Sequence, residues 1–326
     1  MRTKLKSLVH LPMVLSLLVP SLMGAATGDD QANATRPGKA LPSSLRVAVA
    51  NVREGAPARI PADIKHASDR KAFARRLFAQ PGRAPDVVLL QEVLGSAARM
   101  AAVLNAHPRA GRTGARYAVA AAPRILRTPG VCDGRRNGSF TVVRDSAILV
   151  NRATVRSVRQ SGNIRTWGRW GPAAHSLVGR SGFGCSEHPW LRIIVQQPGA
   201  RARAALVASA HVAPVGISMK NHAMARIRKQ LGAQRRKGTG ELVVAGGDLN
   251  LNRCLQPLRT PEQWRCSVRE GHRAPCRPSQ KVFARNVKFL KCQARSLNVG
   301  RPGASCPANL FRRYYSDHPI QLATLH

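Results

Sequence analysis

Residues able to bind metals or transfer protons stand at the ends of short apolar runs in this chain. Asp248 and Asn250 follow the run Leu242–Ala245 in "ELVVAGGDLNLN". Similar positions are held by Asn51 in "VANV", Glu92 in "LLQEV", His211 in "SAHVAP", and Asp317 with His318 in "SDHPI". Only 15 of the 326 residues are Asp or Glu, so carboxylates placed this way are notable. Because strand ends that share one edge of a sheet commonly build a site, we predict that these side chains converge.

The chemistry of this set is that of metal-assisted hydrolysis. Carboxylate and carboxamide oxygens are hard ligands suited to Mg²⁺, Mn²⁺ or Ca²⁺. Imidazoles transfer protons near neutral pH. The sequence contains no G-x-S-x-G nucleophile motif and no P-loop. We therefore expect a divalent metal, Mg²⁺ first, to assist the attack of water on a phosphodiester.

Strands dominate the elements that must position these residues. The apolar patterns predict strands at 45–52, 86–93, 146–151, 190–197, 204–212, 241–247 and 319–325. Helical spacing predicts helices at 68–80, 95–107 and 217–234. The stretches 122–189 and 252–313 read as long loops. Few helices between many strands predict an α/β protein with two mixed sheets.

The charge of the chain points to a polyanionic partner. Lys and Arg number 53, and the formal net charge is +38. Such a surface attracts polyanions and holds them by releasing their counterions. Nucleic acid is the first candidate, followed by an anionic membrane surface or an acidic polymer. No protein partner is implied.

The N-terminus resembles a secretion signal. Three basic residues precede an apolar stretch from Leu8 to Met23 that contains two prolines, and small residues follow. A membrane anchor is the alternative, but a spanning helix needs about 20 apolar residues. We expect a secreted protein with a signal peptide at 1–34, cleaved between residues 25 and 34. A linker at 35–44 and a single catalytic domain at 45–326 would follow.

Cysteine usage agrees with export. Seven cysteines fit an oxidising compartment, and the odd number leaves at least one unpaired within the chain. Their pairing cannot be deduced from the sequence. A zinc site is the alternative for the cluster between Cys254 and Cys306, but no C-x-x-C pair is present.

Together these motifs resemble, in order, those of the endonuclease/exonuclease/phosphatase superfamily, and its deoxyribonuclease I-like branch most of all. The matching segments are "VANV", "LLQEV", "SAHVAP", "GGDLN" and "SDHPI", and "SFTVVRDSAILV" (139–150) resembles a further strand of that branch. The resemblance spans residues 45–321. It implies a four-layer fold in which two packed mixed sheets are flanked by helices.

The resemblance also implies which residues bind metal and substrate. Glu92 would bind the divalent metal together with Asp317, and Asn51 would ligate nearby or orient the phosphate. Arg53 stands where abasic-site endonucleases carry an acid, which argues against that branch. Arg53 would instead contact the phosphate.

Proton transfer would fall to the two histidines. Asp317 would pair with His318, the general base for water, and His211 would protonate the leaving oxygen. Asp248 and Asn250 would position water and the scissile phosphate or hold a second metal. The sequence leaves open whether one or two metals are used.

These observations favour a secreted nuclease for DNA and/or RNA, without separating endo- from exo-cleavage. One alternative is a phospholipid phosphodiesterase similar to bacterial sphingomyelinases, with Trp167, Trp170 and Trp190 entering a membrane interface. The other is a protein that binds polyanions without turnover.

Overall fold

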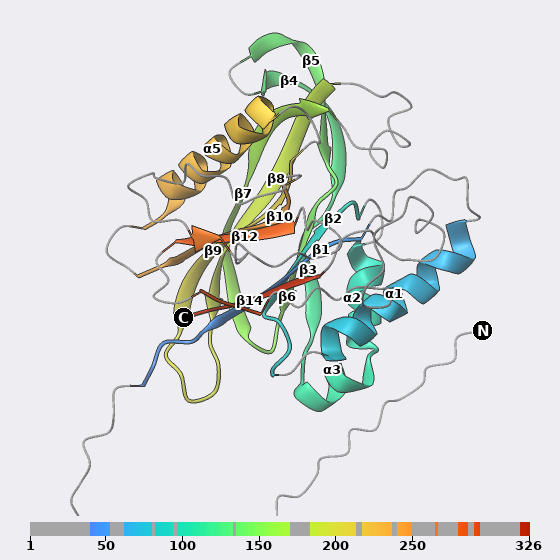
Figure 1. The fold of residues 1–326 in the computed structure, drawn as a ribbon, viewed down its shortest axis with the longest axis vertical. Coiled ribbons are helices and arrows are strands. Elements are labelled where there is room, and N and C mark those ends of the chain that lie inside the picture. Colours follow the sequence, from blue (N-terminus) through green and yellow to red (C-terminus); the bar gives the residue numbers. More distant parts are fainter. Residues whose placement is uncertain are drawn as a thin grey trace, which may run out of the picture. The chain divides into compact units, whose positions relative to one another are not determined.

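Two β-sheets packed face to face form the framework of this chain, shown in Figure 1. The computed structural model describes residues 40–52, 62–79, 82–93, 97–132, 135–169, 183–212, 217–236, 240–249, 265–266, 280–285, 290–293 and 320–326. All of them belong to one unit, Ala40–His326.

The first sheet contains both ends of the folded unit. Its strand order is β13 (Leu290–Gln293), β14 (Gln321–Leu325), β1 (Leu45–Asn51), β2 (Val87–Gln91), β6 (Ala147–Asn151) and β3 (Tyr117–Ala121). Strands β1 and β2 are parallel, whereas β14 and β6 run antiparallel to their neighbours β1 and β2.

The second sheet is built around another parallel pair. Its order is β11 (Arg265–Cys266), β12 (Gln280–Arg285), β10 (Leu242–Asp248), β9 (Arg203–His211), β8 (Phe183–Val195), β5 (Arg135–Arg144) and β4 (Arg124–Cys132). Strand β7 (Val155–Arg169) pairs with β8. Strands β9 and β10 are parallel, as are β5 and β8.

Helices cover the outer face of each sheet. Helices α1 (Ala62–Ala79), α2 (Ala97–Asn105) and α3 (Pro108–Thr113) contribute buried residues to the core outside the first sheet, and α5 (Ile217–Gln234) lies on the second (Figure 1). A third apolar core lies between the sheets. The predicted four-layer α/β architecture is therefore confirmed.

Burial on both faces explains why the central strands are apolar throughout. All seven residues of β1 are buried, and successive side chains alternate between two cores. Val47 and Val49 pack between the sheets, whereas Ala48 and Ala50 face the helices.

Most predicted elements coincide with observed ones, and the helix predicted at 217–234 matches α5 at both ends. The strand predicted at 146–151 matches β6, but the loop prediction for the rest of 122–189 is wrong, because β4, β5, β7 and the first part of β8 occupy much of it. The sequence there is polar and rich in Gly and Arg, so it shows no apolar pattern typical of strands. Backbone pairing of β7 with β8 nevertheless forms a ladder in this stretch. In 252–313, the structure describes only the short strands β11, β12 and β13.

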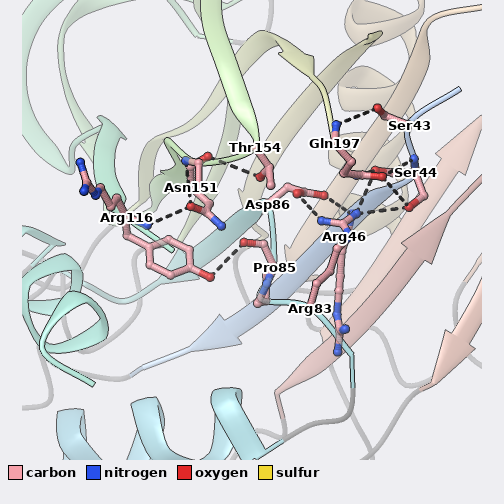
Figure 2. Close-up of polar contacts among 12 residues, drawn as sticks. Ser43, Ser44, Arg46, Arg83, Pro85, Asp86, Arg116, Asn151, Thr154 and Gln197 are labelled. Atoms are coloured by element: carbon pink, nitrogen blue, oxygen red, sulfur yellow. Dashed lines mark hydrogen bonds and ion pairs between the residues drawn. The ribbon is translucent and has the colours of Figure 1, made fainter. Parts of the chain in front are cut away.

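The predicted linker at 35–44 is also too long at its C-terminal end. Ser43 N donates to the carbonyl of Arg201, and Ser44 N donates to Gln197 Oε1 over 3.3 Å. Figure 2 shows these serines beside Gln197 of the loop after β8, together with Arg46, Arg83 and Asp86, which tie the start of β1 to the segment before β2. Residues 40–44 are thus part of the folded unit.

The helices of the described ranges include none that is long and apolar enough to cross a bilayer.

Candidate functional site

The two parallel strand pairs bring four of the predicted site residues to one edge of the sandwich. Asn51, the last residue of β1, pairs with Gln91 at the end of β2, and Glu92 follows directly. In the other sheet, His211 at the end of β9 pairs with Asp248 at the end of β10. The predicted convergence of these four side chains is therefore observed.

Asn51 joins the carboxylates of the two sheets. Its Nδ2 donates to Glu92 Oε1 over 2.8 Å and to Asp248 Oδ2 over 3.0 Å. Asn51 and Asp248 are buried. The amide nitrogen faces both carboxylates and holds them together, and the roles of Asn51 toward a metal or a phosphate stay predictions.

Glu92 is held in a costly backbone conformation and a crowded electrostatic environment. Its φ of 53° lies in the left-handed region, which non-glycine residues adopt uncommonly and at a cost in backbone energy. Burial raises the pKa of its carboxyl, and the charges of Asp145 and Asp248 raise it further. His211 and the Asn51 hydrogen bond only partly oppose this effect. Two further carboxylates close to Glu92 make this a site that favours a cation.

His211 is paired with a carboxylate from the connection between the two sheets. Its Nδ1 lies 2.5 Å from Asp145 Oδ2, and its Nε2 lies 3.7 Å from Glu92 Oε1. Burial alone would lower the pKa of His211, but the charge and hydrogen bond of Asp145, with the charges of Glu92 and Asp248, raise it to about 10. The imidazole is therefore protonated at neutral pH, with Nδ1–H held by Asp145 and Nε2–H available.

Asp145 reaches the site because β6 runs antiparallel to β2. Leu90 near the end of β2 pairs with Ala147 at the start of β6, so Asp145 precedes β6 at the edge where Glu92 follows β2. The Val93 N–H donates to the Asp145 carbonyl, and Ser146 Oγ donates to its Oδ1. These contacts fix the carboxylate that orients His211.

A second histidine holds the backbone behind His211. The His211 N–H donates to His188 Nδ1 over 3.3 Å, and His188 Nε2 lies 2.8 Å from Thr166 Oγ1. Because Nδ1 accepts, the proton of His188 belongs on Nε2 and is donated to Thr166. Burial lowers the pKa of His188 to about 4, which keeps it neutral. The end of β9 is thereby anchored on the face opposite the His211 side chain.

The glycine before Asp248 is required by the close approach of β9 and β10. A Cβ atom on Gly247 would overlap the backbone oxygen of Ala210. The "GGD" sequence therefore lets Asp248 come level with His211 in the adjoining strand.

Two solved structures share this architecture. One is an endonuclease/exonuclease/phosphatase family protein from Bacteroides thetaiotaomicron, with a TM-score of 0.53 and 15% identity over 87% of this chain and 98% of that chain. The other is a mannosyl-6-phosphatase from the same organism, with a TM-score of 0.52 and 13% identity over 86% of this chain and 99% of that chain.

The chain has the endonuclease/exonuclease/phosphatase fold. At this identity the likeness concerns the fold alone. No family model matches the sequence, and no curated protein matches it either.

Within this fold, the residues at the strand ends fit a divalent metal. Glu92, His211 and Asp248 each offer a ligand atom, and these atoms lie within 4.8 Å of one another. The carboxylate oxygens are hard donors, and a cation would offset the crowding that raises the pKa of Glu92. Glu92 and Asp248 are the residues best suited to hold it, because the raised pKa of His211 leaves both of its ring nitrogens protonated.

The remaining predicted site residues lie outside the described part of the chain. They are Arg53, Asn250, Asp317 and His318. Strand β14 begins at Gln321, which pairs with Val49, two residues before Asn51 in β1. Roles for these four residues therefore stay predictions.

Sequence reasoning missed Asp145 and His188. Asp145 lies inside "SFTVVRDSAILV" and directly before an apolar run, so the scarcity of carboxylates that drew attention to Asp248 also applies to it. His188 gave no such signal, because its surroundings "GCSEHP" lack an apolar pattern.

Proposed function

We propose that this chain is a metal-dependent phosphodiesterase that hydrolyses DNA and/or RNA. The observation that carries the proposal is the meeting of Glu92, Asp248 and the His211–Asp145 pair at one edge of the sandwich. This edge combines a place for a divalent cation with a positioned proton donor. Both are needed when a phosphodiester is cleaved by water.

In this proposal His211 acts as the general acid. Asp145 holds Nδ1–H and stabilises the protonated ring, which leaves Nε2–H free to protonate the leaving oxygen. When bound, the metal would neutralise charge developing on the phosphoryl oxygens. Asn51 keeps the Glu92 and Asp248 carboxylates together.

The attacking water needs a base, and we assign this role to His318 with Asp317 as its partner. Asn250 would help to position the phosphate, Arg53 would contact it, and Asp317 would also contribute to metal binding. These assignments rest on the sequence motifs.

The charge of the chain supports a nucleic-acid substrate. A formal charge of +38 favours a substrate with many phosphates over one with a single phosphate. The fold does not select the substrate, since a similarly folded protein is a mannosyl-6-phosphatase. Export is part of the proposal, and it is supported by the N-terminal sequence and by Cys185, which is disulfide-bonded.

The environment of two tryptophans weakens the phospholipid alternative. Trp190 is buried and lies against Gly162, and Trp167 packs on Val142 and Cys185. The Trp190 ring is thus not free to enter a bilayer, and the Trp167 ring is partly buried. Trp170 lies outside the described residues.

One assay separates the candidate functions. Purified protein is incubated with plasmid DNA, with RNA and with sphingomyelin vesicles, each in Mg²⁺ and in EDTA. We expect cleavage of nucleic acid in Mg²⁺ alone and no headgroup release. Headgroup release without nucleic-acid cleavage would favour the phospholipid function, and salt-sensitive binding without any cleavage would leave a polyanion-binding protein.

A further inference from the structure

Three arginines surround one buried carboxylate beside the proposed active site. Arg124 donates through Nε and Nη2 to the two oxygens of Glu187 over 2.8 and 3.0 Å. Arg144 Nη2 lies 2.8 Å from Oε2, and Arg165 Nε lies 3.3 Å from Oε1. The group thus carries two positive charges in excess of its single negative charge.

This group lies on the same face of its sheet as the catalytic histidine. Leu191 and Ile193 of β8 pack between the two sheets, so Glu187, four residues before Leu191 along the same strand, points to that side. Val207 of β9 also packs there, which places His211 on the same face. The cluster therefore continues the inner face of the second sheet beyond His211.

The chain also connects the cluster directly to the site. Arg144 ends β5 and immediately precedes Asp145, the partner of His211. Arg144 itself is buried and is held by the Ala122 carbonyl and by Asn163. Its neighbours Arg124 and Arg165 are the accessible members.

Arg124 and Arg165 keep unused hydrogen-bond donors. Their side chains are 39% and 32% exposed. Among the described residues, Nη1 of Arg124 and both Nη atoms of Arg165 have no acceptor. Glu187 orients the two guanidinium groups through their other nitrogens.

Glu187 can hold this arrangement in its ionised form. Burial raises the pKa of its carboxyl, but the hydrogen bonds and charges of Arg124 and Arg144 outweigh burial and lower the pKa below its usual value. The carboxylate therefore remains charged and fixes the arginines without neutralising all of them.

We propose that Arg124 and Arg165 bind a phosphate group of a polynucleotide substrate, next to the phosphodiester that is cleaved. Guanidinium groups bind phosphate oxygens through paired hydrogen bonds, and a phosphate here would complete the charge balance around Glu187. The inference rests on the proposed function and deepens it. A small diester has no second phosphate to place here, so the subsite selects polymers.

The test compares two arginines of the same strand. Arg165→Gln removes one charge from the subsite, and Arg159→Gln removes one exposed charge about 20 Å away along β7. Steady-state kinetics are measured on a single-stranded oligonucleotide at several salt concentrations and on bis(p-nitrophenyl) phosphate, which carries one phosphate. Thermal melting establishes that each variant is folded.

We expect Arg165→Gln to raise the oligonucleotide KM about three- to tenfold and to reduce the salt dependence by about one counterion. Its kcat, and its activity on the small diester, should stay at the wild-type level, as should all activities of Arg159→Gln. Arg124→Gln gives the same comparison independently, because Glu187 then keeps Arg144 and Arg165.

The outcomes separate this inference from the proposed function. Equal oligonucleotide KM values for the subsite variants and Arg159→Gln would overturn the phosphate subsite, even if the wild-type protein cleaves nucleic acid. A wild-type protein that hydrolyses neither substrate would instead refute the proposed function, and the inference with it.

Discussion

His211 Nδ1 lies 2.5 Å from Asp145 Oδ2, in the connection that carries the chain from the second sheet to the first. His211 ends β9 of the second sheet, and Asp145 lies between β5 of that sheet and β6 of the first. The pair therefore joins the end of β9 to the crossover between the two sheets. Its geometry links the stability of the sandwich to the proposed proton donor.

Asp145→Asn should abolish most of the activity while leaving the fold intact. The amide preserves the shape of the side chain but removes the charge that keeps His211 protonated. We expect kcat on a phosphodiester to fall by about a hundredfold or more, with little change in KM. In the plot of kcat against pH, the fall in rate at high pH that reflects loss of the His211 proton should also move to lower pH. A variant with the wild-type pH profile would exclude this role for Asp145.

Stability should depend on pH in opposite ways through the two neighbouring histidines. The pKa of His188 is about 4 in the folded chain and ordinarily 6.5, so the unfolded chain takes up a proton first as the pH falls. The free energy of unfolding therefore falls as the pH drops from 6.5 to 4, by about 1.4 kcal/mol per pH unit from His188. The pKa of His211 is about 10, so its stabilisation is full below pH 6.5 and is lost as the pH rises toward 10.

Urea unfolding between pH 4.5 and 6.5 in EDTA tests the acid side of this behaviour. His188→Asn should be less stable than wild type at pH 6.5 but should show a shallower pH dependence, by one proton. Parallel curves for the two proteins would contradict a neutral, buried His188.

Gly247→Ala should destabilise the protein by about 3 kcal/mol or more, because the new methyl group overlaps the Ala210 carbonyl and must displace the strand backbone. Gly111→Ala is the matched control. Gly111 lies in α3 with nothing within 4 Å of the added methyl group, so alanine should be neutral or stabilising by up to about 1 kcal/mol. Denaturant unfolding of both variants provides the comparison, and equal effects would argue against the close strand pairing.

Glu92→Gln should raise the melting temperature of the metal-free protein and abolish its response to Mg²⁺. The raised pKa of Glu92 means that its ionised form is disfavoured in the folded chain, so a neutral isostere removes a cost. Asp86→Asn should instead lower the melting temperature, because Asp86 accepts a hydrogen bond from Arg46 N and forms an ion pair with Arg83. Melting scans in EDTA and in Mg²⁺ test both. A melting temperature of Glu92→Gln below that of the wild type in EDTA would show that Glu92 is not destabilised by the nearby carboxylates of Asp145 and Asp248.

The sequence predicted the part of the site that depends on strand ends. Each short apolar run marks where a strand ends, and parallel strands place these ends at the same edge of a sheet. The four residues at these ends could therefore be grouped from the sequence: Asn51, Glu92, His211 and Asp248. Two mixed sheets followed from the many strand patterns between few helices, and the four-layer fold followed from the family resemblance.

The missed features depend on tertiary pairing. Strand β8 begins well before its apolar segment because β7 pairs along its whole length, so nothing in "GCSEHP" marks His188 as buried. Asp145 lies in the connection between the two sheets and contacts His211, which is 66 residues away in the chain. Local patterns carry no information about such contacts.

Hydrolysis of a dinucleotide, a phosphodiester whose sugar alkoxide leaving group needs a proton, by wild type, His211→Gln and His326→Ala tests the central claim most directly. His326 is an exposed control that follows β14, where that strand pairs with the start of β1, at the edge opposite Asn51. We predict that the wild type and His326→Ala hydrolyse the diester in Mg²⁺ but not in EDTA. His211→Gln, which thermal melting should show to be folded, is expected to be at least about a hundredfold slower. Equal rates for His211→Gln and wild type, or hydrolysis that EDTA does not affect, would contradict the proposed site.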